Sequence, residues 1–240
     1  MNYIGHLAFG MHSYNFLKDY IEDKDVFLTA CVAPDIAKRQ DMPKDEAHYR
    51  NLSDTLYSCP DIKRFVERYS ERLKEDFVIG YLCHLYADMV FASIYLPSIA
   101  KPLNNEYKFS NTKNATYVKI TKSNTIIPVS VFLSDIGIYD DYTKTNLILA
   151  NKFGITEDIK YSNKNPRIYE IDENKLSEIK DAVNQYIGPY AEKPIIKGDT
   201  LAIDIKEYIN FIESTASDFC ITYVKYLHYY ECAKGNKKRN

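Results

Sequence analysis

The sequence contains 240 residues, of which 45% are hydrophobic and 27% are charged, so it is neither a disordered nor a fibrous chain. Its 31 lysines and arginines nearly balance 33 aspartates and glutamates, and the net charge of −2 gives no support to nucleic-acid binding. At about 100–200 residues per domain, this length predicts one domain over residues 1–240. The chain has no tryptophan and only 5 histidines, so each histidine can be considered separately.

Cysteine usage and hydropathy indicate a cytoplasmic location. The five cysteines are odd in number and none forms a Cys-x-x-Cys pair, which argues against a disulfide framework and excludes a zinc ribbon. The N-terminus has no basic stretch of the kind that opens a secretory signal. The most apolar stretch, 77–100, is interrupted by His84 and Asp88, so we expect no transmembrane segment.

Helical periodicity dominates the first hundred residues, where apolar side chains recur every three or four positions. One apolar run ends at Ala33-Pro34-Asp35, and the proline predicts a helix-terminating corner that carries Asp35. Residues 39–58 are polar and are expected to form mostly loop, and Pro97 is expected to follow the end of a helix. The predicted helices of this half span 7–21, 26–32, 60–73 and 74–96.

The middle of the chain has a different pattern. Segments 116–120 and 125–131 are rich in β-branched residues and predict a hairpin or an ordered insertion over about 104–135. Pro128 would confine the second strand to a sheet edge, because proline has no N–H to donate.

Helical patterns resume after the insertion. Gly154 is a predicted helix stop, and Gly188-Pro189 is another. A break near Ser214-Thr215 is left open, and Gly235 is a candidate end for the last helix. The helices predicted here span 138–153, 172–187 and about 201–230. The fold class is therefore mainly α, a multi-helix bundle with a small β-hairpin insertion.

His84 and Asp88 are polar residues in a helix that is otherwise apolar nearly all round. Because they are four residues apart, they lie on the same stripe of that helix. Gly80, one turn earlier, costs about 1 kcal/mol relative to alanine, which indicates a need for close access beside His84. A buried carboxylate needs a partner or a bound cation, so Asp88 must be satisfied by one or the other.

Three other residues can join this pair. His6 opens the first apolar helix, Asp35 lies at the Ala-Pro corner, and His48 lies in a polar loop that could reach the same pocket. The resulting set offers nitrogen and oxygen donors without a thiolate, which suits a catalytic zinc or a zinc pair bridged by Asp88. The candidate metal ligands are His6, Asp35, His48, His84 and Asp88.

The order of these residues resembles the zinc-dependent phospholipase C family, whose α-helical fold is shared with single-strand-specific zinc nucleases. The resemblance is carried by residues 1 to about 97, and most specifically by Gly80-Tyr-Leu-x-His84-x-x-x-Asp88 preceded by Ala33-Pro-Asp35 and His48-Tyr-Arg50. It implies that Asp35, His48, His84 and Asp88 surround one zinc, and that His6 joins Asp88 at a neighbouring metal position.

The resemblance implies a zinc-dependent hydrolase that acts on a small-molecule or lipid phosphoester, with Asp35 in the catalytic site. Arg50 would steady the phosphate by paired hydrogen bonds. A bound zinc could bring the pKa of water to about 7 and polarise a phosphoryl oxygen. Family members that are secreted use an N-terminal tryptophan and a further His-x-x-x-Glu pair, and this chain has neither, so we expect one or two zinc ions.

Several alternatives stay open at this point. Asp140 or Asp141, or His228 with Glu231, could complete the site, whereas His12 is expected to be a surface or packing residue. A helical binding or scaffold protein with a structural or vestigial metal site is the main alternative function. A zinc nuclease is a third, although the charge balance disfavours nucleic-acid partners.

Overall fold

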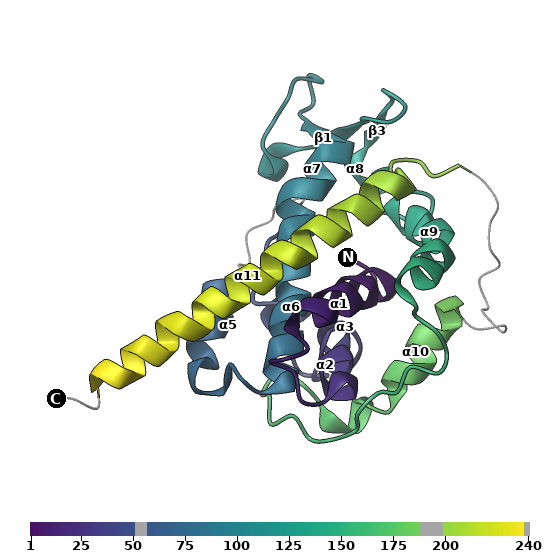
Figure 1. The fold of residues 1–240 in the computed structure, drawn as a ribbon. Coiled ribbons are helices and arrows are strands. Elements are labelled where there is room, and N and C mark those ends of the chain that lie inside the picture. Colours follow the sequence, from purple (N-terminus) through teal and green to yellow (C-terminus); the bar gives the residue numbers. More distant parts are fainter. Residues whose placement is uncertain (51–56, 188–198, 238–240) are drawn as a thin grey trace.

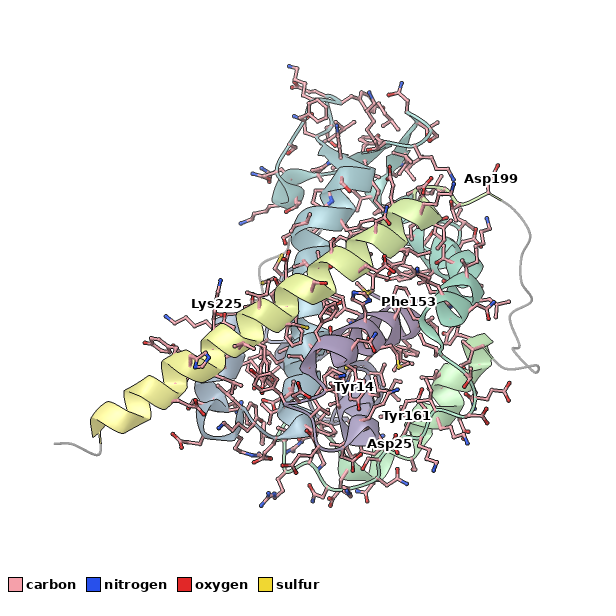
Figure 2. The ribbon with its side chains drawn as sticks, viewed as in Figure 1. Tyr14, Asp25, Phe153, Tyr161, Asp199 and Lys225 are labelled. Carbon is pink, nitrogen blue, oxygen red and sulfur yellow. The ribbon has the colours of Figure 1, made fainter. Side chains whose placement is uncertain are left out.

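The computed structural model describes residues 1–50, 57–187 and 199–237, and it is mainly helical with a small antiparallel sheet. Helix α6 (Asp76–Val90) runs through the interior and packs against α1 (Tyr3–Leu17), α2 (Lys24–Ala30), α5 (Ile62–Arg68) and α11 (Ile205–Lys237) (Figure 1). Side chains fill the space between these helices (Figure 2). The predicted mainly α fold with a small β insertion is confirmed.

The N-terminal helices begin at side-chain caps. The Asn2 side chain accepts a hydrogen bond from the Gly5 amide, so α1 begins before the predicted start and contains His6. The Asp23 carboxylate caps α2 in the same way. The Ala-Pro corner then begins a short helix, α3 (Ala33–Ile36), because the proline fits a first turn where no amide is needed. Asp35 thus lies within a short helix that follows the corner.

The polar stretch 39–58 contains one helical turn, α4 (Lys44–Ala47), and its residues 51–56 lie outside the described part of the chain. Helix α5 starts after Asp61, whose side chain accepts from the Arg64 amide, so Pro60 precedes the cap rather than opening the helix. A short 3₁₀ turn, Ser70–Arg72, links α5 to α6.

The prediction that a helix ends before Pro97 is wrong. After α6 the helix continues through a π turn at Phe91–Tyr95 into α7 (Leu96–Ile99), where Pro97 occupies the first turn. Among the described residues, one helical stretch, Asp76–Ile99, is long and apolar enough to cross a membrane, with a mean hydropathy of 1.6, and 78% of its most apolar window is buried inside the protein. A central helix enclosed by its neighbours meets the same criterion.

The sheet has three antiparallel strands in the order β1-β2-β3, and it projects from one end of the helical body (Figure 1). Strands β2 (Tyr117–Ile120) and β3 (Ile126–Pro128) form the predicted hairpin, with Pro128 on the edge strand as expected. Strand β1 (Ala100–Leu103) was not predicted, because Ala-Lys-Pro-Leu lacks β-branched residues. A short helix, α8 (Val129–Phe132), follows the sheet.

The second half of the chain is helical as predicted, with shifted boundaries. Helix α9 (Ile138–Phe153) ends at Gly154, whose φ of 68° is left-handed. The segment predicted from 172 is a 3₁₀ turn, Glu173–Lys175, followed by α10 (Glu178–Ile187), and Gly188-Pro189 lies outside the described residues. Helix α11 begins after Asp204, which accepts from two amides, and it runs without a break at Ser214-Thr215 and past Gly235.

Candidate metal centre

The side chains of all five candidate ligands meet in the interior, next to the N-terminal amine that precedes α1. His6 comes from α1, Asp35 from α3, His48 from the residue after α4, and His84 and Asp88 from α6. Their side chains are at most 4% exposed. The five residues predicted as candidate ligands come from four separate segments, and the fold brings their side chains together.

The ligand atoms form two overlapping groups. His6, His84 and Asp88 make one group, and Asp35, His48 and His84 make the other, and within each group the ligand atoms lie within 4.8 Å of one another. His48 Nε2 is 3.2 Å from Asp35 Oδ1, and His6 Nε2 is 3.3 Å from Asp88 Oδ1. His84 is common to both groups, whereas the resemblance implied that Asp88 is the shared ligand. Asp88 Oδ2 is nevertheless 3.9 Å from His48 Nε2, so this carboxylate also faces the second group.

The imidazole rings are oriented by backbone carbonyls. His48 Nδ1 is 2.8 Å from the Lys44 carbonyl oxygen, and His84 Nδ1 is 2.9 Å from that of Cys31. When each Nδ1–H donates to its carbonyl, the Nε2 lone pair of each ring is directed into the cluster, which is the arrangement of metal-ligating histidines. The His6 ring stacks on His84 with centroids 3.8 Å apart.

Three buried ring nitrogens have no hydrogen-bond partner among the described residues: His6 Nδ1, His6 Nε2 and His84 Nε2. An unsatisfied buried polar atom costs about 1–3 kcal/mol. Two of these atoms, the Nε2 atoms of His6 and His84, lie in the group that also contains the Asp88 carboxylate. The donor atoms of these residues therefore fit a divalent metal ion.

The environment favours the protonation states that bind metal. Burial lowers the pKa of His6 and of His84, so both rings are neutral at pH 7. Burial alone would raise the pKa of Asp35, but His48, His84 and Lys44 outweigh it and hold that pKa well below its usual range. The pKa of Asp88 is also held well below its usual range, because the N-terminal amine, His6 and His84 outweigh the effect of burial.

Three cations contact the two carboxylates. The Met1 amine donates to Asp88 Oδ1 at 2.6 Å, Arg50 donates to Asp88 Oδ2 at 2.7 Å, and Lys44 Nζ is 2.7 Å from Asp35 Oδ1. The Lys44 side chain is 57% exposed and that of Arg50 is 20% exposed, so these two cations form the edge of the cluster nearest to solvent. Sequence reasoning identified Arg50 and missed the Met1 amine and Lys44.

Glu170 was also missed, and it supports the loop that carries His48. Its carboxylate is 1% exposed and accepts hydrogen bonds from the hydroxyls of Tyr49 and Tyr69, each at 2.5 Å. Arg68 completes the cluster at 3.0 Å. Tyr49 has a left-handed φ of 53°, uncommon for a bulky residue, and its anchored hydroxyl holds this turn between His48 and Arg50. The sequence signal that could have indicated a buried carboxylate is the position of Glu170 within the apolar segment Ile-Tyr-Glu-Ile.

Gly80 provides close access for a helix rather than for a ligand. A Cβ added at Gly80 would lie 2.3 Å from the Phe27 carbonyl oxygen and 2.7 Å from the Ala30 Cβ, so α2 packs directly against α6 at this point. That approach places the carbonyl of Cys31, which follows α2, beside His84 Nδ1. The glycine therefore positions the candidate metal ligand His84 indirectly.

The other sequence candidates have different contacts. The Asp141 carboxylate accepts hydrogen bonds from the amides of residues 201–203, which is a structural role. Asp140 pairs with Lys144, and Glu231 pairs with Lys74 on the other side of the molecule from α9. Among the described residues, none of Asp140, Asp141, His228 and Glu231 belongs to the close ligand groups. His12 packs against Phe16 and Phe153, as expected of a packing residue.

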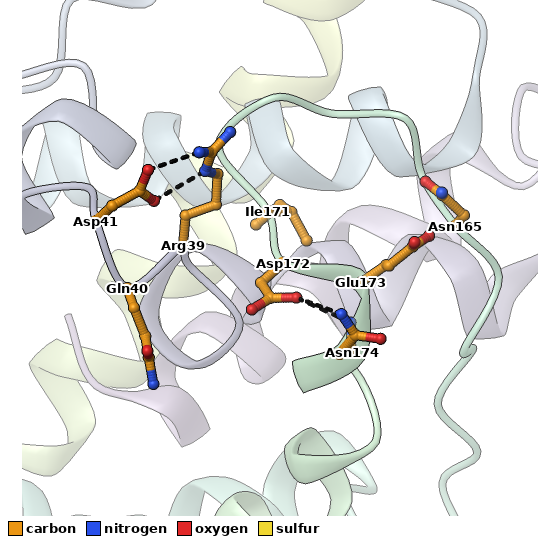
Figure 3. Close-up of a pocket in the computed structure, with 8 residues that line it drawn as sticks. All are labelled: Arg39, Gln40, Asp41, Asn165, Ile171, Asp172, Glu173 and Asn174. Atoms are coloured by element: carbon orange, nitrogen blue, oxygen red, sulfur yellow. Dashed lines mark hydrogen bonds and ion pairs between the residues drawn. The ribbon is translucent and has the colours of Figure 1, made fainter.

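Two surface hollows differ in their relation to the cluster. One of about 500 Å³ lies between residues 39–41 and 171–174, where Arg39 is paired with Asp41, and it contains none of the five ligands (Figure 3). Another of about 320 Å³ is lined by residues of α1, α9 and α10. Its lining also contains none of the five ligands, but it includes Asn2 and Tyr3, which follow Met1, and the Met1 amine contacts Asp88 at 2.6 Å. This hollow therefore lies next to the cluster.

Comparison of the chain with protein-family models, with curated proteins and with solved structures gives no significant match.

Proposed function

We propose that this protein is a zinc-dependent hydrolase that cleaves a phosphoester, and that it is similar in mechanism to the zinc-dependent phospholipases C. The observation that carries the proposal is the pair of buried His/Asp groups sharing His84, in which ring nitrogens of His6 and His84 make no hydrogen bond to any residue that the structure describes. Nitrogen and oxygen donors without thiolate suit hydrolytic zinc sites, whereas sulfur-rich sets are typical of structural ones.

The residues divide into ligands and anion-binding groups. His6, Asp35, His48, His84 and Asp88 would hold one or two zinc ions. When bound, zinc supplies Lewis acidity toward a phosphoryl oxygen and a nucleophile derived from water at neutral pH. Arg50 and Lys44, the cations at the solvent edge, would pair with the phosphate oxygens, and the planar Arg50 guanidinium can do so with two parallel hydrogen bonds.

Asp35 is the carboxylate proposed for the catalytic role. It lies beside Lys44 at the exposed edge and 3.2 Å from His48 Nε2. Because its pKa is held well below the usual range, Asp35 stays ionised and accepts hydrogen bonds at neutral pH. We infer that Asp35 orients the attacking water toward the phosphorus by accepting a hydrogen bond from it. Asp35 does not act as the general base, since a carboxylate with a low pKa is a weak base.

The hollow of about 320 Å³ beside the cluster would receive the rest of the substrate. Its wall combines tyrosine rings with amide and hydroxyl groups, and Asp135 is the one carboxylate among the described residues that line it. Such a lining accommodates an organic group attached to the phosphate. The substrate class is therefore a small-molecule or lipid phosphoester.

A second candidate function is a binding or scaffold protein in which the metal is structural. The observation that favours it is the burial of all five ligands, whose side chains are at most 4% exposed. Structural sites are closed by protein ligands, whereas catalytic sites keep an open position.

Hydrolysis assays distinguish these functions. Purified protein is supplied with p-nitrophenyl phosphocholine, p-nitrophenyl phosphate, bis-p-nitrophenyl phosphate and a single-stranded oligonucleotide, with and without a chelator. The proposal predicts chelator-sensitive release of p-nitrophenol that Arg50→Ala lowers at least tenfold, whereas Lys63→Ala on α5, whose side chain is 82% exposed, leaves it unchanged. Bound zinc without turnover of any substrate supports the structural function, and cleavage of the oligonucleotide alone supports a nuclease.

A further inference from the structure

The sheet buries one face against the helices, and its other face carries lysines beside exposed apolar side chains. Side chains of residues paired across antiparallel strands lie on the same face, and alternate residues lie on opposite faces. Val118 and Ile120 are fully buried and, with Ala100, form the face against the helices. Antiparallel sheets of this kind normally expose polar residues on the other face.

The register defines the residues of the opposite face, which we name the outer face. Lys101 pairs with Lys119, and Lys119 pairs with Ile126, so these three residues form one row across the sheet. The next row contains Phe109, which bridges to Leu103, and then Tyr117 and Pro128. No acidic residue is paired into either row. The outer face consists of Lys101, Leu103, Phe109, Tyr117, Lys119, Ile126 and Pro128.

Two large apolar side chains of the outer face are exposed, whereas Leu103 is only 2% exposed. Phe109 is 71% exposed and Ile126 is 44% exposed. The Tyr107 ring, itself 56% exposed, packs on Tyr117 with centroids 4.8 Å apart and extends the same surface. Aromatic rings of this kind are enriched where proteins meet the interface between lipid and water.

The two lysines face each other without an acidic partner. Lys101 and Lys119 are directly opposite on β1 and β2, and neither makes an ion pair with any residue that the structure describes. Like charges directly opposite on neighbouring strands are destabilising. An anionic surface placed over this row would neutralise both charges, so the row has charge complementarity to an anion.

We propose that the outer face docks onto an anionic lipid bilayer, with Lys101 and Lys119 at the headgroups and Phe109 and Ile126 inserted below them. Each lysine near such a surface contributes about a fivefold increase in binding, and exposed apolar groups add to it. The docking is independent of the metal centre, because no residue of the outer face belongs to that cluster.

The size and charge of the outer face disfavour the other occupants. Four-residue strands extend about 13 Å, and three strands span about 10 Å, so the face is several times smaller than the roughly 800 Å² that a stable protein partner covers. A second copy docked symmetrically would bring the same lysine pair close to itself, and its charges would repel. A bilayer has no such minimum area.

Vesicle co-sedimentation tests the proposal with the full chain in the presence of a chelator. Sucrose-loaded vesicles contain either phosphatidylcholine alone or phosphatidylcholine with 30% phosphatidylserine. The proposal predicts at least tenfold stronger binding to the anionic vesicles. Lys101→Glu/Lys119→Glu should weaken that binding at least tenfold, and Phe109→Ser should weaken it severalfold. Lys180→Glu/Lys225→Glu, on α10 and α11, makes the same change in net charge and should reduce binding less than twofold.

Circular dichroism confirms that each variant is folded before binding is compared. Equal binding to both kinds of vesicle would overturn the proposal, and so would equal losses in the sheet variant and in the helix control. Retention of poly(U) by the wild type, lost in Lys101→Glu/Lys119→Glu and without any vesicle binding, would identify a nucleic-acid surface instead. Because a chelator is present throughout, these results do not depend on the proposed hydrolase activity.

Discussion

The cluster of five candidate ligands and the outer face of the sheet depart in opposite ways from the rule that polar side chains are exposed and apolar side chains are buried. The cluster buries the side chains of two carboxylates and three imidazoles, each at most 4% exposed, whereas the outer face exposes a phenylalanine and an isoleucine to solvent. Buried polar groups and contiguous exposed apolar groups are the informative exceptions in a folded protein. In the first region, buried ring nitrogens of the described residues have no hydrogen-bond partner. In the second, apolar side chains are in contact with water. A metal ion therefore suits the first region and a lipid surface suits the second.

The largest expected effect comes from removing the buried carboxylate that organises the cluster. In a chelator, Asp88→Ala should lower the free energy of unfolding by about 3 kcal/mol, because it leaves the Met1 amine and Arg50 without their buried anion. Urea denaturation measures the change. Asp45→Ala is the control, since Asp45 is 47% exposed and lies 3.8 Å from Arg50, and it should cost at most about 0.5 kcal/mol. Equal losses would show that the burial of Asp88 contributes nothing.

A second prediction tests whether helix packing positions His84. Gly80→Ala should destabilise the protein by about 2 kcal/mol, because its Cβ would overlap the backbone carbonyl of Phe27, which cannot move without shifting α2. Gly10→Ala is the matched comparison and should cost less, since its Cβ would meet the side chain of Cys31, with Sγ at 2.8 Å, and no backbone atom. Thermal denaturation of both variants measures the difference, and an equal loss in both would contradict this account of Gly80.

A third prediction separates support of the site from general stability. Tyr49→Phe should cost about 1 kcal/mol of stability and weaken zinc binding about tenfold, because it frees the turn that carries His48 from Glu170. Tyr57→Phe removes a comparable buried hydrogen bond, to the Ala100 carbonyl, and should cost similar stability with unchanged zinc affinity. Calorimetric titration with zinc measures both affinities, and parallel changes in the two variants would exclude a positioning role for Tyr49.

The smallest expected effect is a pH dependence that belongs to the cluster and not to the outer face. Burial lowers the pKa of His6 in the folded protein. In the unfolded chain the pKa of this residue has its ordinary value of about 6.5, so the unfolded chain binds a proton at a higher pH than the folded protein does. The free energy of unfolding therefore falls as the pH is lowered through 6.5, and His6 contributes about 0.5–1 kcal/mol of this loss between pH 7 and pH 6. His6→Gln should flatten the profile in a chelator, and Lys119→Gln should leave it unchanged. A steeper profile in His6→Gln would contradict the pKa direction.

The candidate ligands Asp35, His84 and Asp88 could be predicted because each has a local signature in the sequence. The four-residue spacing of His84 and Asp88 fixes a shared helix face, and the Ala-Pro corner marks Asp35. Glu170 and the Met1 amine could not be predicted, because their contacts with Tyr49 and Asp88 join residues 121 and 87 positions apart. Such pairings follow from tertiary packing and leave only a weak local pattern.

The predicted elements show the same limit. The hairpin was predicted from its β-branched residues, but its pairing with β1 depends on a segment that contains proline and no β-branched residue. The outer face follows from that three-stranded register, so it was not accessible from sequence. Likewise Pro97 is a helix breaker by local rules, and the π turn before it allows the helical path to continue.

The central claim is that His6, Asp35, His48, His84 and Asp88 form a metal site. Zinc content measured by mass spectrometry after dialysis of purified protein tests it most directly. The account predicts one or two zinc ions per wild-type chain, loss of bound zinc in His84→Ala, and full content in His12→Ala, whose ring packs outside the cluster. A wild-type protein without zinc after zinc loading, or equal zinc content in wild type and His84→Ala, would contradict the account.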